Sequence, residues 1–205
     1  MAQLIRTEIP TAENSSNFNV AAESATTVGT TLENLKAAIS GETGASAKYT
    51  AFAEAADKQG FGKIARLFRC TAAAEQLHIG LEYNLVIKAE PDFVKPTAEA
   101  PAAGTSDLNL IAGAQGEIYE TVDMYPSFIK KAQEEGDNAA VAVFTRAKLA
   151  EAYHAERYLD AYNTIDVADD NEKYYLCPMC GYIHKGEDFE KCPICFVPKA
   201  KFTAF

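Results

Sequence analysis

The sequence has no long apolar run, and this absence excludes one large class of protein. No stretch approaches the roughly 18 apolar residues that a bilayer-spanning helix needs. The longest apolar run in the predicted helices covers only residues 139–144. Residues 1–16 also contain no apolar segment of the 7–15 residues that is typical of a secretory signal. We therefore expect a cytoplasmic protein that does not associate with membranes.

Basic residues are also scarce. The chain has 19 Lys and Arg against 29 Asp and Glu, which gives a net charge of −10. This balance argues against binding to the phosphates of nucleic acids. The composition, with 48% hydrophobic and 23% charged residues, is that of an ordinary globular protein. The excess of acids instead suggests a cation as a partner.

Apolar residues recur at steps of three and four, which predicts amphipathic helices. The four predicted helices cover about residues 31–57, 61–89, 107–134 and 138–165. Thr30 and Glu33 form the pattern of a capping box at the first start. Gly60 and Gly136 are expected helix ends, and Asp137 is an expected N-cap.

A proline-rich connection separates the second and third predicted helices. Three prolines in residues 91–106 prevent a continuous helix there. Sixteen extended residues span up to about 53 Å, whereas a 30-residue helix is about 45 Å long. The connection can therefore run the length of the bundle and make the second and third helices parallel. The predicted fold is mainly α, a ferritin-like four-helix bundle with one long crossover.

The polar, acidic residues 166–171 predict a hinge before a smaller unit. Residues 172–205 hold four of the five cysteines. This segment is too short to form a stable hydrophobic core without a cross-link such as a bound metal. We therefore predict an N-terminal extension (1–27), a four-helix bundle (28–168) and a small C-terminal metal-binding domain (169–205).

Each predicted helix places residues that are costly to bury on its apolar face. They are Glu42 on the first helix, Glu75 and His78 on the second, Glu117 and Glu120 on the third, and Glu151 and His154 on the fourth. One such residue alone would be an ordinary solvated side chain at the edge of the face. Two helices that each give a Glu and two that each give Glu-x-x-His instead match a two-metal site. Without cations, these carboxylates would repel one another or take up protons.

The ligand types narrow the choice of metal. One imidazole for each ion favours a transition metal, with iron ahead of manganese, and oxygen or peroxide chemistry follows. A minimal two-metal site of this type has six ligands, and the four helices offer one residue more. Glu117 or Glu120 would therefore be an additional ligand, an alternate ligand or a proton-handling group. The hydroxyls of Tyr49 and Tyr125 could reach the ligands, although both residues also suit an ordinary core. Pro126 is expected to kink the third helix.

The cysteines form two Cys-x-x-Cys motifs, Cys177-Pro-Met-Cys180 and Cys192-Pro-Ile-Cys195, separated by eleven residues. Four thiolates at this spacing predict one tetrahedral site for iron or zinc, and a structural zinc ribbon remains an alternative. Cys70 is expected to be a buried apolar residue without chemistry. His184 is expected to be exposed and not a ligand.

Together these motifs resemble the rubrerythrin family. The resemblance covers about residue 27 to the C-terminus. It rests on Gly41-Glu42, Glu75-x-x-His78, Glu117-x-x-Glu120, Glu151-x-x-His154 and the motifs that run from Cys177 to Cys195. It implies a non-haem di-iron peroxidase that reduces hydrogen peroxide to water in oxidative-stress protection. A third iron, in a rubredoxin-like domain, would relay electrons from a donor such as a rubredoxin or its reductase.

The resemblance also implies roles for the ligands. Glu75 and Glu151 would bridge the two irons, and His154 would bind the second iron. Glu42 and Glu117 would be terminal ligands, while His78 and Glu120 would alternate on the first iron. The competing functions are a ferritin-like ferroxidase or iron store and a di-iron oxygenase. The expected working unit is a homodimer in which the cysteine iron of one chain serves its partner, because the fourth helix should lead the chain away from its own di-iron site.

Overall fold

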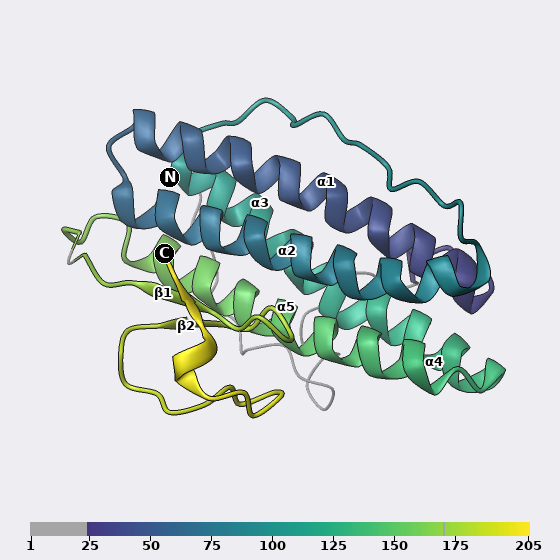
Figure 1. Ribbon diagram of the computed structural model, residues 1–205. Coiled ribbons are helices and arrows are strands. Elements are labelled where there is room, and N and C mark those ends of the chain that lie inside the picture. Colours follow the sequence, from purple (N-terminus) through teal and green to yellow (C-terminus); the bar gives the residue numbers. More distant parts are fainter. Residues whose placement is uncertain (1–23, 170) are drawn as a thin grey trace.

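The computed structural model describes residues 24–169 and 171–205, so most of the predicted N-terminal extension lies outside the described residues. Five α-helices and a short π-helix form the larger part of the fold (Figure 1). They are α1 (Thr31–Lys58), α2 (Gly62–Ala89), α3 (Ser106–Tyr119), η2 (Glu120–Met124), α4 (Tyr125–Glu135) and α5 (Asn138–Asn163). The C-terminal part contains β1 (Tyr174–Leu176), β2 (Ile183–Lys185), the 3₁₀ turn η3 (Lys199–Lys201) and β3 (Thr203–Ala204).

Local sequence signals set the helix ends. The Thr30 side chain accepts a hydrogen bond from the Glu33 backbone, and the Glu33 side chain accepts one from Thr30, so the predicted capping box is confirmed. Asp137 caps α5 by accepting from the Ala140 backbone N–H at 2.9 Å. Gly136 ends α4 with a φ of 74°, a left-handed conformation that glycine adopts at little cost.

The third predicted helix is not continuous α-helix. It consists of α3, η2 and α4, and the N–H of Tyr125 bonds to the carbonyl of Glu120, five residues earlier. Pro126 follows directly and has no N–H with which to bond the Val122 carbonyl. The expected disturbance next to the ligands therefore takes the form of a wider π-helical turn.

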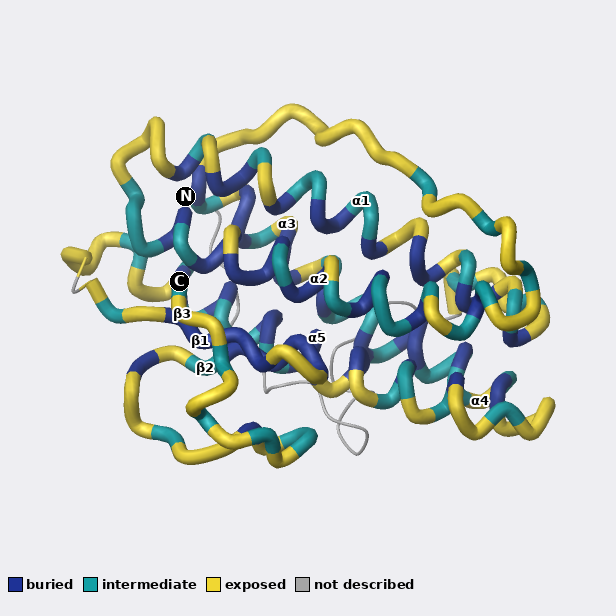
Figure 2. Tube along the Cα trace, viewed as in Figure 1, coloured by how far each residue is buried: buried dark blue, intermediate teal, exposed yellow. Residues whose placement is uncertain are grey.

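The long crossover is confirmed. The segment between α2 and α3 passes back along the bundle, so that α2 and α3 run in the same direction (Figure 1). Buried residues line the inner faces of the helices (Figure 2). They form two apolar clusters, one around Tyr49, Phe68 and Tyr158 and the other around Tyr125 and Phe144. The fold is the predicted ferritin-like four-helix bundle with a small C-terminal domain.

The C-terminal residues 174–205, called here the cysteine module, fold back onto the bundle of their own chain. Their strands form an antiparallel sheet in the order β2-β1-β3, and β1 and β2 contact α2 and α5. Leu176 and Ile183 join Cys70 in one apolar cluster, so Cys70 is a buried packing residue. The expectation that the chain leads away from its own centre is therefore wrong for this structure, because the link after α5 reverses the chain.

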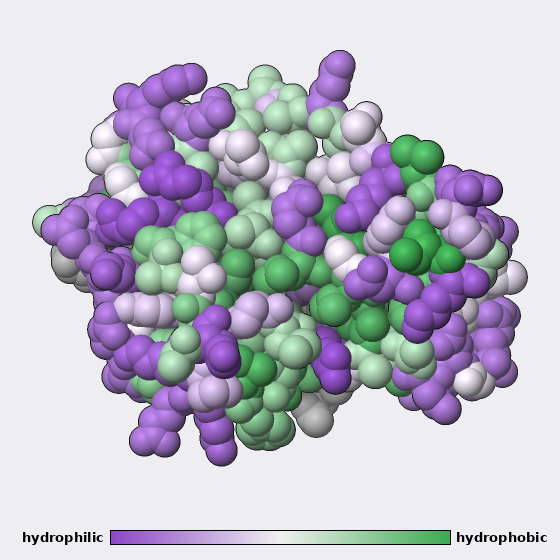
Figure 3. Space-filling view, in the orientation of Figure 1, coloured by the Kyte–Doolittle hydropathy of each residue, from purple (hydrophilic) through white to green (hydrophobic). Residues whose placement is uncertain are grey.

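On the face in Figure 3, hydrophilic side chains are interspersed among the apolar ones. Among the described residues, no helix combines the length and the apolar character that crossing a membrane would require.

Candidate metal centre

Six predicted ligands meet in the middle of the bundle. The helices contribute them as Glu42 from α1, Glu75 and His78 from α2, Glu117 from α3, and Glu151 and His154 from α5. Each is at most 1% exposed. They lie on the inner helix faces because their spacing repeats the three- and four-residue steps of the apolar core. Water is therefore excluded from the groups that face one another here.

The donor atoms form two groups that share two carboxylates. Glu42, Glu75, His78 and Glu151 make one group, and Glu75, Glu117, Glu151 and His154 make the other, with the ligand atoms of each group within 4.8 Å of one another. The two oxygens of Glu151 face different imidazoles, with Oε1 2.7 Å from His78 Nδ1 and Oε2 2.6 Å from His154 Nδ1. Glu75 likewise turns Oε2 toward His78 and Oε1 toward His154. This arrangement suits two bridging carboxylates between two ions.

Backbone carbonyls of the cysteine module orient both imidazoles. His78 Nε2 lies 3.1 Å from the Cys180 carbonyl oxygen, and His154 Nε2 lies 2.8 Å from that of Gly181. A carbonyl only accepts, so each Nε2 carries the hydrogen and donates it. Each Nδ1 of a neutral imidazole then presents a lone pair to the carboxylate cluster. This tautomer is the one that a metal ligand needs.

Several buried polar atoms of the cluster form no well-aligned hydrogen bond, although the Glu151 oxygens lie 2.7 and 2.6 Å from the imidazole nitrogens. They are Glu42 Oε2, both oxygens of Glu75 and Glu151, Glu117 Oε2, and Nδ1 of His78 and His154. Burial is the largest cause that raises the pKa of Glu42 and Glu117, and neighbouring carboxylates raise it further. Two divalent cations would neutralise these four carboxylates and bind the donor atoms that make no hydrogen bond. The residues present therefore fit a metal pair.

Two tyrosines donate to the ligands. The Tyr49 hydroxyl donates to Glu117 Oε1 at 2.5 Å, and the Tyr125 hydroxyl donates to Glu42 Oε1. Burial raises the pKa of both phenols, so they keep their hydrogens. The structure thus brings both sequence-predicted tyrosines into contact with carboxylates of the centre.

Glu120 is the one predicted ligand of the bundle that belongs to neither group of donor atoms. It begins η2, one helical turn beyond Glu117, and is partly exposed. Burial raises the pKa of Glu120 most, and the charges of Glu151 and Glu75 raise it further, so Glu120 lies within electrostatic range of the centre. His78 Nδ1 lies 3.8 Å from Glu42 Oε1. A further buried acid, Glu82, was not predicted as a site residue, although it continues the inner row one turn after His78.

The four predicted cysteines converge in the cysteine module. Their Sγ atoms lie within 4.8 Å of one another, with 3.4 Å from Cys177 to Cys195 and from Cys180 to Cys192. A tetrahedral site with metal–sulfur bonds of 2.3 Å has sulfurs about 3.7 Å apart. His184 is not part of this group and instead contacts Tyr182 and Asp188.

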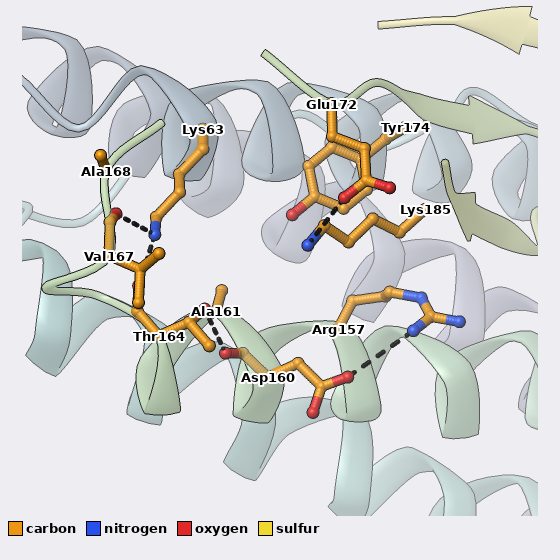
Figure 4. Close-up of a pocket in the computed structure, with 10 residues that line it drawn as sticks. All are labelled: Lys63, Arg157, Asp160, Ala161, Thr164, Val167, Ala168, Glu172, Tyr174 and Lys185. Atoms are coloured by element: carbon orange, nitrogen blue, oxygen red, sulfur yellow. Dashed lines mark hydrogen bonds and ion pairs between the residues drawn. The ribbon is translucent and has the colours of Figure 1, made fainter. Parts of the chain in front are cut away.

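Figure 4 shows a small cavity where the cysteine module meets the ends of α2 and α5. Its charged side chains are engaged in contacts with protein groups. Lys63 donates to the carbonyls of Thr164 and Val167, and Lys185 pairs with Glu172 at 3.0 Å. We interpret these contacts as stabilising the position of the cysteine module on the bundle.

Comparisons with known proteins agree with this architecture. The rubrerythrin family model matches residues 33–162, and the model for the rubrerythrin rubredoxin-like domain matches residues 175–203. Nigerythrin from Nitratidesulfovibrio vulgaris is 69% identical over 201 residues, which cover 98% of this chain and 99% of that protein. Rubrerythrin from the same organism is 35% identical over 179 residues, 84% of this chain and 92% of that protein.

A solved structure described as the fully reduced, all-ferrous state of nigerythrin is also similar. It has a TM-score of 0.89 and 68% identity, and the match covers 99% of this chain and 100% of that one. The carboxylate–histidine cluster and the four-cysteine cluster correspond to the di-iron site and the rubredoxin-like iron site of this family. From the matched domains, the shared identity and these two clusters, we conclude that the chain belongs to the rubrerythrin family.

Proposed function

We propose that this protein is a peroxidase that reduces hydrogen peroxide to water, with electrons that pass through the cysteine module. The observation that carries the proposal is the direct link between the two metal sites. Cys180, a cysteine-site residue, and its neighbour Gly181 accept hydrogen bonds from the two histidines of the bundle site. A one-electron site is thereby joined to a buried two-metal site, a connection that neither iron storage nor a structural zinc ribbon needs.

The chain's own residues would hold the irons as follows. Glu75 and Glu151 would bridge them, Glu42 and His78 would complete the first position, and Glu117 and His154 the second. When bound, the iron pair supplies two electrons to one O–O bond. Tyr49 and Tyr125 hold Glu117 and Glu42 in place by their hydrogen bonds and keep hydrogens next to the reacting groups. We also propose that Glu120 replaces His78 as a ligand when the first iron is oxidised, because ferric iron favours an anionic oxygen.

We propose further that an external electron donor, such as a rubredoxin or its reductase, reduces the cysteine iron, and that the working unit is a cytoplasmic homodimer. We also propose the domain boundaries predicted from the sequence, which lie between residues 27 and 28 and between residues 168 and 169. Two identical chains present identical contact surfaces. A module could therefore make the contacts of Cys180 and Gly181 on the bundle of its partner as well as on its own.

Stopped-flow mixing of the fully reduced protein with hydrogen peroxide or with dioxygen tests the proposed function. We expect peroxide to oxidise the di-iron site far faster than dioxygen does. Equal rates, together with hydroxylation of an added hydrocarbon, would show an oxygenase instead. Accumulation of ferric mineral from added ferrous iron would show a ferroxidase.

A further inference from the structure

Glu82 is a buried acid that the two metal sites do not use. It lies on α2 one turn beyond His78, is 0% exposed, and belongs to neither group of ligand atoms. Its Oε1 is 3.1 Å from the Tyr125 hydroxyl, and its Oε2 has no hydrogen-bond partner. Apolar residues of the same helix, Ile79 and Val86, are buried on either side of it along the chain. An ionised carboxylate is costly in such a place.

The two contacts of the Tyr125 hydroxyl indicate which of the neighbouring carboxyl groups is protonated. The Tyr125 hydroxyl contacts both Glu42 Oε1 and Glu82 Oε1. Its single hydrogen cannot make two full hydrogen bonds, and two ionised carboxylates would repel each other across this oxygen, so the arrangement favours a hydrogen on one of the two carboxyl groups. Glu42 belongs to a ligand group, and a ligand carboxylate is deprotonated. The hydrogen therefore belongs to Glu82, which donates to Tyr125, while Tyr125 donates to Glu42.

The environment of Glu82 agrees with this assignment. Burial is the largest influence on Glu82 and raises the pKa of its carboxyl group to about 8. A carboxylic acid in an apolar site can stay neutral at pH 7 and act as a hydrogen-bond donor. Glu82 thus stores a proton two hydrogen bonds away from the metal centre.

We propose that Glu82 is a buried proton donor that acts through Tyr125 and supplies one of the two protons consumed when peroxide is reduced. This inference rests on the proposed function. Hydrogen peroxide, two electrons and two protons yield two water molecules as the O–O bond breaks, and the electrons come from the two ferrous ions. The Glu82 hydrogen moves to the Tyr125 oxygen while the Tyr125 hydrogen moves to Glu42 and on to a product oxygen. Solvent supplies the second proton and later restores the one on Glu82.

The test uses Glu82→Gln in the metal-loaded protein, with Glu54→Gln as the matched control on the exposed side of α1. Glutamine keeps the shape and can donate an N–H to Tyr125, but it has no proton to release. Infrared spectra should show the carbonyl band of a protonated carboxylic acid in the native protein and in Glu54→Gln, shifted in D₂O and lost in Glu82→Gln. Oxidation of the reduced protein by peroxide in a single turnover should slow on the order of 100-fold in Glu82→Gln only.

Three results would overturn the inference: no such band in the native protein, the same band in Glu82→Gln, or a native single-turnover rate in Glu82→Gln. If Glu82→Gln does not fold, Tyr125→Phe should shift the band and slow the reaction, and an unchanged band and rate would equally contradict the inference. If the native protein does not react with peroxide, the proposed function is refuted, and so is the transfer of the Glu82 proton to a product of peroxide reduction. The infrared band, measured without peroxide, decides separately whether Glu82 holds a proton.

Discussion

At the scale of single residues, Glu75 and Glu151 differ from the other ligands because each faces both imidazoles with different oxygens. Glu117, which we propose as a terminal ligand, belongs to one group of donor atoms only. Removal of either carboxylate that we propose as a bridge should therefore affect both metal positions, whereas the four thiolates lie in a separate group and should keep their metal.

We expect Glu151→Ala to lose both bundle irons and to retain the cysteine iron, so the iron content should fall from about three to about one per chain. Metal analysis measures the content, and the visible spectrum identifies the cysteine-bound iron. Glu134→Ala, an exposed change on α4, is the control and should keep all three. Retention of the bundle irons in Glu151→Ala would rule out the bridging role.

At the scale of elements, the turn that contains Cys180 and Gly181 packs directly on the bundle site. Gly181 has a φ of 77°, and a Cβ atom there would collide with the His78 imidazole. Gly186 has a similar φ of 88°, but a Cβ there would meet the flexible end of Glu172. The two glycines therefore form a matched pair with equal backbone strain and different neighbours.

We expect Gly181→Ala to weaken docking of the module and slow electron transfer from the cysteine iron to the bundle on the order of 100-fold, as for a misplacement of about 1 Å. Gly186→Ala should leave that rate near the native value. Rapid-reaction spectroscopy after reduction of the cysteine iron would measure the rate of electron transfer to the bundle. Equal rates in the two variants would argue against the carbonyl–histidine contact as the route.

The π-helical segment η2 begins at Glu120, and π-helical turns are frequent at functional sites. The N–H of Glu120 still bonds to the Gly116 carbonyl as in an α-helix, and the wider turn follows it, up to the bond from Tyr125. We expect Glu120 to be a ligand in the oxidised protein and His78 in the reduced protein, with a displacement of the first iron between them. Crystal structures of both states would show this exchange, and identical ligands in both would contradict it.

At the scale of the whole molecule, the link after α5 determines which bundle the module meets. In this structure it reverses, and Arg66 pairs with Asp169 of the link at 2.5 Å. A homodimer with exchanged modules would keep the contacts of Cys180 and Gly181, because the two bundles are identical.

Mixed dimers test the proposed exchange. One chain would lack Cys192 and Cys195, and the other would lack Glu75 and Glu151. If modules are exchanged, turnover with an external electron donor should appear in the mixed dimer through its one intact pair of sites and be absent from both parent homodimers. An inactive mixed dimer would show that electrons pass within one chain.

Much of the candidate site could be predicted because its signals are local. Glu-x-x-His pairs at helical spacing point to the same side as the neighbouring apolar residues, and Cys-x-x-Cys pairs form their turns from a few residues. The capping box at Thr30 and the N-cap Asp137 are local in the same way. Such features depend on chemistry within one or two helical turns.

The four-helix architecture, the parallel crossover and the residues that we propose for the metal sites could therefore be predicted from the sequence alone. Three features became visible in the folded chain alone: the cysteine module returns over His78 and His154, Glu120 lies outside both groups of ligand atoms, and Glu82 shares the Tyr125 hydroxyl with Glu42. These contacts join residues far apart in the chain. Helical periodicity shows which face of a helix is buried, but it does not show which side chain of another element meets that face.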